Sequence, residues 1–326
     1  AAQDFILQRV NDDVFKNPED LAENLRLIAD YLKRRHPGYL FVAPVQTADK
    51  KEMVFSPGNG YFRMFPFIRN SRTVTVVDNA LQAWEAAHQF GLFTKNLAGF
   101  PAGQLKITLP DFHNLSLRYS QFEQALQNGN PERIRECAAW IAIAQSCYDI
   151  VAEFEMIKTN PAFKIRVTHH DTKISNVLFD PQDKGLCVID LDTVMPGYFI
   201  SDVGDMMRTY LSPIGEEEPD YRQIEVRMDF FSAIVKGYLQ EMRDELTETE
   251  KTCFIYAGKF MIYMQAIRFL TDYLNNDIYY GAKYPRHNLV RAGNQFTLLQ
   301  RLLDKESLLA RIQLKECAEA IPKQGY

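Results

Sequence analysis

The sequence predicts an α+β protein with a small β-rich N-terminal part and a larger, helical C-terminal part. Short apolar stretches separated by turn residues occupy residues 1–68, whereas long segments with apolar residues at helical spacing fill most of residues 69–326. With 326 residues, 46% of them hydrophobic, the chain can bury a core large enough for both parts. We therefore predict two lobes, with the boundary after residue 68.

The N-terminal part opens with a predicted strand at residues 4–11. A helix start follows at Asn17 and Pro18, because asparagine caps free backbone N–H groups and proline suits the first helical position. The apolar stripe of this helix consists of Leu21, Leu25, Ile28 and Leu32. Further strands are expected near residues 41–42, 53–55 and 61–65.

A turn is expected at residues 56–60, which contain Gly58 and Gly60. Neighbouring glycines can also form a phosphate-binding loop, but that loop leads from a strand into a helix. Here strands are predicted on both sides, so the sequence favours a hairpin turn.

The C-terminal part is predicted to be mainly helical after a hinge near residues 65–71. Its helical patterns cover residues 74–92, 118–127, 131–158, 219–243, 249–275 and 289–314. One segment with short strands, around residues 169–192, interrupts them. A further helix is expected to start near Asp202.

Composition excludes several functional classes. The net charge of −5 argues against nucleic acid or an anionic membrane surface as the main partner, since both select basic proteins. The five cysteines are scattered, with no spacing typical of zinc sites or disulfide frameworks, as in a reducing cytoplasm. No signal-peptide pattern opens the chain, and the apolar run at 137–144 is too short to span a bilayer. We expect a cytoplasmic protein.

One motif contains side chains that are typical of a catalytic site. His169, Asp171, Lys173 and Asn176 follow the pattern H-x-D-x-K-x-x-N, and Asp190 comes 19 residues after Asp171 at the end of an apolar strand. Phosphoryl transfer needs these side chains: one carboxylate accepts the acceptor's proton, while an amide and a second carboxylate hold Mg²⁺ on the nucleotide phosphates. The pattern therefore predicts a small-molecule kinase with a bilobal, protein-kinase-like fold.

Each residue of the motif receives a role. Asp171 is the expected base, and Lys173 is expected to reach the transferred phosphate. Asn176 and Asp190 are the expected Mg²⁺ ligands. His169 is expected to brace the loop. A chance match or a pseudokinase that retained the motif is the alternative.

Residues near the motif have open alternatives. His170 is either an acceptor contact or a hydrogen-bonding loop histidine, and Asp192 could join the metal shell or stand behind it. Asp205 is expected to anchor the backbone of the loop. In the predicted helix at 249–275, Arg268 either pairs with Asp272 or points into an acceptor pocket beside Tyr279 or Tyr280.

Residues 169–180 and 187–197 resemble bacterial N-acetylhexosamine 1-kinases, a branch of the aminoglycoside phosphotransferase and choline kinase superfamily. The resemblance extends to residues 5–11, 202–205 and 268–273. It implies transfer of phosphate from ATP, with Mg²⁺, to the anomeric hydroxyl of N-acetylglucosamine or N-acetylgalactosamine. It also implies that Asp171 acts on that hydroxyl and that Asp190 binds Mg²⁺. Arg268 and Tyr279 would hold the sugar, and we also assign His170 and Asp192 to the acceptor side.

The chain departs from this family in its nucleotide-binding residues. The family places a strand, a glycine-containing phosphate loop and another strand before residues 5–11, so we expect the N-terminal lobe to be incomplete as given. Gln8 or Arg9 replaces the lysine that usually holds the α- and β-phosphates. Glu23 is the expected partner of that residue. Two aromatic side chains near the hinge complete the expected nucleotide site, Phe65 and Phe67.

Other functions remain as alternatives. A kinase with a choline, amino acid or aminoglycoside acceptor would keep the same motif, but a cationic acceptor favours carboxylates and aromatic faces. A hydrolase such as a sulfatase would need a C/S-x-P-x-R motif, and none of the cysteines has it. A non-catalytic sugar-binding homologue is a further alternative. The expected partners are ATP and a small sugar, without nucleic acid or membrane.

Overall fold

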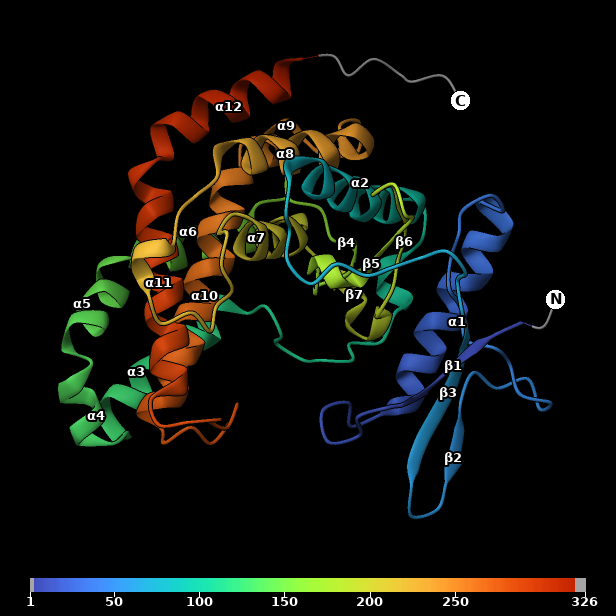
Figure 1. Cartoon of the computed structure of the whole chain (residues 1–326), viewed down its shortest axis with the longest axis horizontal. Coiled ribbons are helices and arrows are strands. Elements are labelled where there is room, and N and C mark those ends of the chain that lie inside the picture. The colour runs from blue at the N-terminus through green and yellow to red at the C-terminus, as the bar shows by residue number, and fades with distance from the viewer. Residues whose placement is uncertain (1–2, 320–326) are drawn as a thin grey trace.

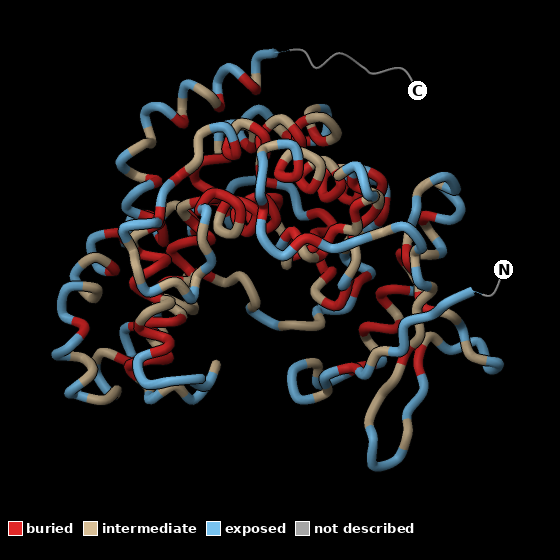
Figure 2. Tube along the Cα trace, in the orientation of Figure 1, coloured by how far each residue is buried: buried red, intermediate tan, exposed pale blue. Residues whose placement is uncertain are grey.

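The protein has an α+β, bilobal kinase-like fold, described here from a computed structural model over residues 3–319. Three strands and one helix from the N-terminal part of the chain lie to one side, and a larger body of helices lies to the other (Figure 1). Buried residues are concentrated in the helical body, whereas the strands are more exposed (Figure 2). The predicted fold class is confirmed.

The N-terminal sheet is antiparallel and has the order β1-β3-β2. Its strands are β1 (Phe5–Arg9), β2 (Val54–Ser56) and β3 (Gly60–Pro66). Ser56 pairs with Gly60 across a tight turn in which Gly58 has a φ of 79°, so the hairpin prediction is confirmed. The strand expected at 41–42 is wrong. That segment lies beside β3 without a ladder, and Val45 donates one backbone hydrogen bond to Met64.

Helix α1 (Pro18–Arg35) connects the two parts through its apolar stripe. Near its start, Leu21 packs with Val10 and Met53 against the sheet. One and two turns later, Leu25 and Ile28 belong to the main core of the helical body. Because a single rigid helix contributes to both cores, it restricts the movement of the sheet relative to the rest of the protein.

The helical body is more finely divided than the sequence predicts. The pattern at 131–158 forms three helices that break at Cys137 and Cys147, and the pattern at 74–92 becomes helical only after Asn79, whose side chain caps Gln82 N. The patterns at 219–243, 249–275 and 289–314 likewise begin late or divide. The helices are α2 (Ala80–Asn96), α3 (Leu115–Asn128), α4 (Pro131–Glu136), α5 (Ala138–Ser146), α6 (Tyr148–Thr159), α7 (Phe199–Tyr210), α8 (Met228–Met242), α9 (Glu248–Lys251), α10 (Phe254–Leu274), α11 (His287–Asp304) and α12 (Glu306–Ala318).

Helix α10 forms the centre of this body. Almost all of its residues are buried, as its apolar sequence predicts, and it packs against α7, α11 and α3. Helices α2 and α8 pack together on the other side of α7. No helix within residues 3–319 is long and apolar enough to cross a membrane.

Two short antiparallel ladders are held against these helices. Strand β4 (Arg166–Thr168) pairs with β7 (Met195–Gly197), and β5 (Val177–Phe179) pairs with β6 (Gly185–Val188). The segment with the motif runs through these ladders. Helix α7 contacts β4 and the turn at Ile174–Asn176, so the packing of α7 against α10 supports the position of the motif.

Gly204 allows α7 to approach α10 closely, which predicts an unusual effect of Gly204→Ala. Alanine usually stabilises a helix by about 0.5–1 kcal/mol relative to glycine. Here a Cβ would overlap the carbonyl oxygen of Ala257, so we expect a loss of about 1–3 kcal/mol in the free energy of unfolding. Urea unfolding measures it. Gly215→Ala is the control, because its Cβ would meet nothing within 4 Å. A stability gain in Gly204→Ala would contradict the prediction.

Candidate active site

The β5–β6 hairpin brings two polar residues of the motif together. Residues 169–173 follow β4, and a short 3₁₀ turn (Ile174–Asn176) leads into β5. Val177 pairs with Val188, and Ile189 N donates to Asn176 O at 2.9 Å. Asn176, just before β5, therefore lies beside Asp190, just after β6. Their separation in sequence is bridged by one local hairpin.

Helix α7 holds the backbone of the loop with two buried carboxylates. Asp202 accepts hydrogen bonds from His169 N at 2.9 Å and His170 N at 2.7 Å, and Asp205 accepts one from Thr172 N at 2.8 Å. The contact of Asp205 agrees with the anchoring role expected from the sequence, whereas that of Asp202 was not expected. A signal was available, because Asp202 and Asp205 are three residues apart and so share one face of a helix.

These carboxylates ionise in an unfavourable environment. Burial raises the pKa of Asp202 to about 6, even though His169 and the two backbone N–H donors lower it. Burial also raises the pKa of Asp205, against the effect of Arg208, which bonds to it at 2.9 Å. The loop is thus held by buried carboxylates whose charge is favoured by a neighbouring cationic or imidazole side chain, His169 for Asp202 and Arg208 for Asp205, and by the hydrogen bonds they accept.

His169 supports the loop through contacts of its ring and of its backbone carbonyl. Its Nε2 lies 2.9 Å from the carbonyl oxygen of Ile189, and its ring packs edge-on against Phe90. Thr193 Oγ1 donates to its backbone carbonyl at 2.6 Å. These contacts are of the bracing kind that the sequence analysis expected.

Asp171 lies at the junction of two cavities. Its Oδ2 is 3.1 Å from Lys173 Nζ and accepts a hydrogen bond from Asn176 Nδ2 at 3.1 Å. Burial disfavours the charge on Lys173, but Asp171 raises the pKa of the ammonium overall. Asp171 and Lys173 line a cavity of about 480 Å³, whereas Asn176 lines a neighbouring cavity of about 320 Å³ with Asp190. The carboxylates of Asp171 and Asp190 and the side-chain amide of Asn176 thus lie in adjoining cavities of one cleft.

Asp190 suits a cation. Burial and the nearby Asp192 raise the pKa of its carboxyl, and no hydrogen bond or ion pair to that carboxyl is present among residues 3–319. The same residues contain no cluster of three or more His, Cys, Asp or Glu side chains for a metal. Mg²⁺ typically binds to one or two carboxylates together with substrate phosphates, and Asp190 with the side-chain amide oxygen of Asn176 could form such a donor set.

The smaller cavity also contains Arg63, a cation that the sequence analysis missed. Its side chain is 2% exposed and bonds to Asp192 at 2.5 Å and to Gln8 Oε1 through Nε at 3.0 Å and Nη2 at 2.8 Å. Its Nη1 is buried and has no hydrogen-bond partner within the part of the chain that the structure describes. A single arginine within the apolar strand 61–65 was the available signal, since a buried charge requires partners.

Three expected nucleotide or acceptor contacts are corrected. Glu23 lies near Lys106 at 3.8 Å and does not approach β1. Arg9 is 62% exposed and faces Asp12, while Gln8 faces the cavity, because strand alternation sends neighbours to opposite faces. Asp192 pairs with Arg63 and does not line the larger cavity.

The smaller cavity has an apolar lining formed by residues from both parts of the chain. Phe65 and Phe67, the expected nucleotide contacts, line it. The aliphatic residues around them are Ile6, Val42, Ile68, Leu178 and Ile189. These side chains offer planar and aliphatic surfaces, and Asn176, Asp190 and Arg63 add polar groups to the same lining, with the Arg63 guanidinium 5.1 Å from the centre of the Phe65 ring.

The larger cavity contains the expected acceptor residues His170, Arg268 and Tyr279. Arg268 does not pair with Asp272. It donates to Gln265 at 3.1 Å and to the Tyr279 hydroxyl at 3.5 Å, while Asp272 accepts from the backbone N–H groups of Tyr279 and Tyr280. Burial lowers the pKa of His170 to about 4, so its imidazole is neutral near pH 7.

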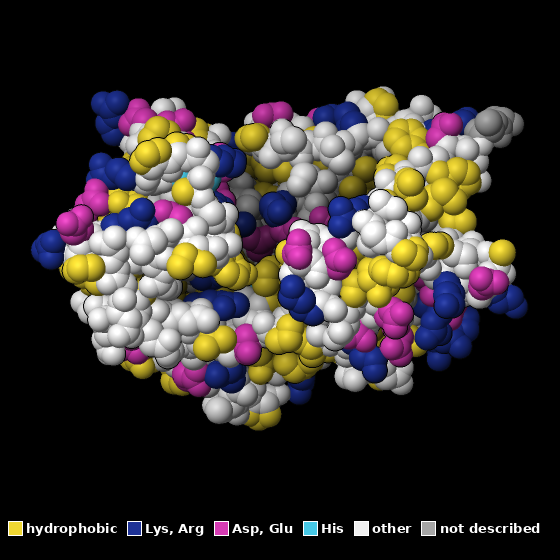
Figure 3. All heavy atoms as spheres, turned by 90° about the horizontal axis from the view of Figure 1, so that it is seen from below, with side chains coloured by type: hydrophobic (Ala, Val, Ile, Leu, Met, Phe, Trp, Pro, Cys, Tyr) yellow, Lys and Arg dark blue, Asp and Glu magenta, His cyan; other side chains and the backbone are white. Residues whose placement is uncertain are grey.

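Further charged residues that the sequence analysis missed complete this cavity. Arg208 and Arg291 both bond to Glu216, and Arg208 also bonds to Asp205. Viewed from below, the surface is hollowed between the two parts, with acidic side chains in its depth and Lys or Arg side chains around it (Figure 3). The carboxylates on the acceptor side are therefore neutralised by arginines, except for Asp171, which faces Lys173.

Comparison with known families decides the general class. Residues 1–239 match the model of the phosphotransferase enzyme family, which covers well over half of the chain. The chain belongs to this family. It is therefore a phosphotransferase of the small-molecule kinase type, as the sequence analysis predicted at that level.

Solved structures agree on the fold of this phosphotransferase. An aminoglycoside phosphotransferase from Alicyclobacillus acidocaldarius is 12% identical, with a TM-score of 0.61, over 96% of this chain and 86% of that one. A microcompartment-associated aminopropanol kinase is 15% identical, with a TM-score of 0.61, over 94% and 87%. A choline/ethanolamine kinase family protein from Mesorhizobium loti is 15% identical, with a TM-score of 0.55, over 96% and 86%. At such identities the likeness establishes the fold alone.

The raised pKa of Asp202 predicts a pH dependence of stability in this phosphotransferase. The folded Asp202 titrates at about 6 and an unfolded aspartate near ~3.9, so the folded state binds the proton more tightly. The contribution of Asp202 to stability therefore falls as the pH rises from about 4 to about 6.

The difference in unfolding free energy between the wild type and Asp202→Asn isolates this effect. We expect the wild type to lose about 3 kcal/mol relative to the variant across that range. Urea unfolding at intervals of pH measures it. A difference that stays constant or increases with pH would contradict the assignment.

Proposed function

We propose that this phosphotransferase transfers phosphate from Mg²⁺–ATP to the anomeric hydroxyl of an N-acetylhexosamine, either N-acetylglucosamine or N-acetylgalactosamine. The observation that carries the proposal is the place of Asp171, which lines a cavity with neutralised charges and is hydrogen-bonded to Asn176 of a neighbouring cavity that also contains Asp190. The resemblance of residues 187–197 to hexosamine kinases supports the choice of acceptor.

The smaller cavity is the proposed nucleotide site. Phe65 and Phe67 supply apolar surface for a planar base, and Asn176 and Asp190 would hold Mg²⁺ at the phosphates. Mg²⁺ bound there would neutralise charge on the phosphate oxygens. The cation would also stabilise the ionised carboxylate of Asp190, since burial disfavours that charge and raises the pKa of the group.

Asp171 is the proposed base. The hydrogen bond from Asn176 and the ion pair with Lys173 hold its Oδ2, and the residue lines the larger cavity, where the acceptor would bind. As the acceptor oxygen attacks the γ-phosphorus, its proton passes to Asp171, and the bond to the leaving oxygen of ADP breaks. Lys173 would stabilise the charge on the transferred group.

The charges of the larger cavity favour a neutral acceptor. Asp205 and Glu216 are already neutralised by arginines, and Arg268 has no carboxylate partner among residues 3–319. A choline or an aminoglycoside would place its positive charge near Arg208, Arg268 and Arg291. A hydroxylated ring can instead accept hydrogen bonds from Arg268 and lie against Tyr279.

ADP release, measured with the full-length protein on a panel of acceptors, tests the proposal. We expect turnover with N-acetylhexosamines and formation of the 1-phosphate, with little turnover of choline, ethanolamine or aminoglycosides. Turnover of a cationic acceptor at a higher kcat/KM than any hexosamine would overturn the choice of acceptor.

Substitution of Asp171 and of Asp190 should change different kinetic parameters. Asp171→Asn should lower kcat by about 10²–10⁴-fold with little change in the KM for ATP, because the proton acceptor is lost while the metal site remains. Asp190→Asn should instead raise the Mg²⁺ and ATP concentrations needed for half-maximal rate. The exposed Asp229 on α8 provides the control variant, Asp229→Asn. Equal and mild losses in both variants would contradict the roles.

Arg63 is the proposed replacement for the usual phosphate-binding lysine. Its unpaired Nη1 and its position beside Gln8 and Asp190 support a contact with the α- or β-phosphate. Loss of one charge-assisted hydrogen bond, worth about 1.5–3 kcal/mol, should raise the KM for ATP about 10- to 100-fold in Arg63→Met.

Two further variants test this contact. Arg63→Lys keeps the charge and should recover part of the ATP affinity, and Arg9→Met on the exposed face should behave as wild type. The KM for the hexosamine should remain unchanged in Arg63→Lys. An unchanged ATP affinity in a folded Arg63→Met protein would reject the contact.

A further inference from the structure

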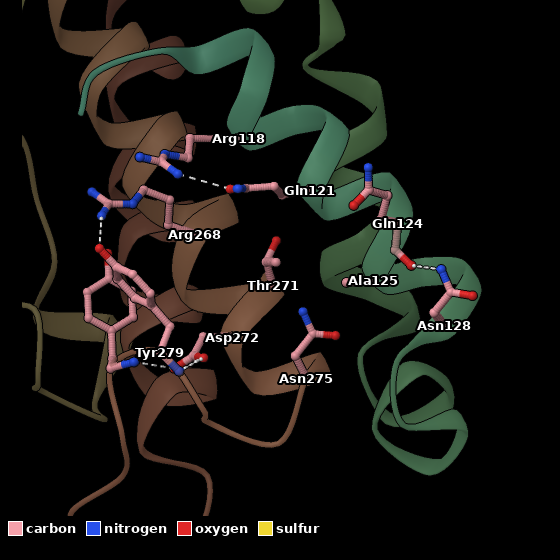
Figure 4. A pocket seen from close by; sticks show the side chains of 11 residues that line it. Arg118, Gln121, Gln124, Ala125, Asn128, Arg268, Thr271, Asp272, Asn275 and Tyr279 are labelled. Atoms are coloured by element: carbon pink, nitrogen blue, oxygen red, sulfur yellow. Dashed lines mark hydrogen bonds between the residues drawn. The ribbon is translucent and has the colours of Figure 1, made fainter. Parts of the chain in front are cut away.

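A third cavity, of about 390 Å³, adjoins the acceptor cavity. It lies between α3 and the C-terminal half of α10 (Figure 4). Arg268, Tyr279 and Tyr280 line both cavities and form the wall between them. Its volume falls within the range of small-molecule sites, about 300–1,000 Å³. The catalytic roles described above make no use of this space.

Two polar atoms at this cavity are buried and lack partners within residues 3–319. Arg118 donates to Gln121 through Nη1 and to the Asp111 carbonyl through Nη2, but its Nε has no acceptor. Thr271 Oγ1 has no hydrogen bond either, although a helical threonine commonly bonds to a carbonyl one turn earlier. Unsatisfied buried polar atoms are unfavourable, and a polar ligand in the cavity would satisfy them.

The lining suits a neutral, polyhydroxylated ring. Gln121, Gln124, Asn128 and Asn275 each offer both a donor and an acceptor, as sugar hydroxyls require. Tyr279 presents an exposed ring at one side, to which the apolar face of a sugar can pack.

Charges around the cavity disfavour charged ligands of either sign. Arg118 and Arg268 lie close enough for their charges to interact, which would repel a cation. Asp272, which also lines the cavity, accepts hydrogen bonds from Tyr279 N and Tyr280 N and would repel an anion.

We propose that this cavity is a subsite for a second, neutral sugar unit of the acceptor. The reducing-end hexosamine would lie at Asp171, and the glycosyl group attached to it would extend past Arg268 and Tyr279 to lie between α3 and α10. The wall can open, because the Arg268–Tyr279 hydrogen bond is long, at 3.5 Å, and Tyr279 is 71% exposed. The inference rests on the proposed hexosamine kinase activity and extends its substrate class to disaccharides.

Steady-state kinetics with two acceptors test this subsite in the full-length protein. One acceptor is the free N-acetylhexosamine, and the other is a disaccharide in which a neutral hexose is linked to that hexosamine at the reducing end. We expect the disaccharide to have a KM about tenfold lower, as one or two additional hydrogen bonds would provide.

Variants on α3 locate the effect. Gln124 and Asn128 are exposed and line this cavity but not the acceptor cavity. Gln124→Ala combined with Asn128→Ala should raise the disaccharide KM about tenfold and leave the monosaccharide KM unchanged. Gln127→Ala, an exposed position on the same helix outside the lining, should change neither.

The outcomes separate this inference from the proposed function. Turnover of the monosaccharide with equal or weaker use of the disaccharide overturns the subsite and leaves the kinase proposal intact. An acidic disaccharide preferred over the neutral one overturns the neutral assignment. Absence of turnover with both sugars overturns the proposed function and the subsite with it.

Discussion

The candidate site depends on the hydrogen bonds that Asp202 and Asp205 accept from the backbone of residues 169–172. Three backbone N–H groups within four residues, those of His169, His170 and Thr172, are directed toward one helix. From the same helix, the Tyr210 hydroxyl donates to the carbonyl of Thr172 at 2.6 Å. His170 has a φ of 66°, a strained conformation for a histidine, and these bonds hold it there. The side chain of Asp171 is presented to the cleft as a result.

The carboxylates of the cleft fall into two groups, those paired with arginines and those without such a partner among residues 3–319. Arg63 neutralises Asp192, and Arg208 and Arg291 neutralise Asp205 and Glu216. Among residues 3–319 Asp190 forms no ion pair, at the point where a metal and phosphates would bind, and Asp171 is paired with the half-exposed Lys173. The buried pairs define which carboxylates are structural, and the remaining ones are those available for chemistry.

The orientation of the N-terminal sheet relative to the helical body is set by a few polar links besides α1. The Arg63–Asp192 pair joins β3 to the segment after β6. Asn24 on α1 donates to the carbonyls of Lys106 and Val194, and it accepts from Lys106 N at 2.8 Å. Because the Arg63 link and one of the Asn24 links end at residues 192–194, the proposed nucleotide side and the metal-suited residues are positioned together.

The sequence by itself determined the α+β class, the hairpin at Gly58 and the meeting of Asn176 with Asp190, because each follows from short-range periodicity or from one hairpin. It also indicated the buried α10 and the anchoring place of Asp205. Only the tertiary structure decided that Gln8 faces the cleft, that Arg63 takes Asp192, that Glu23 lies apart and that Arg268 avoids Asp272. These choices depend on how helices and strands far apart in the chain pack, and a charged side chain takes the partner that packing brings nearest.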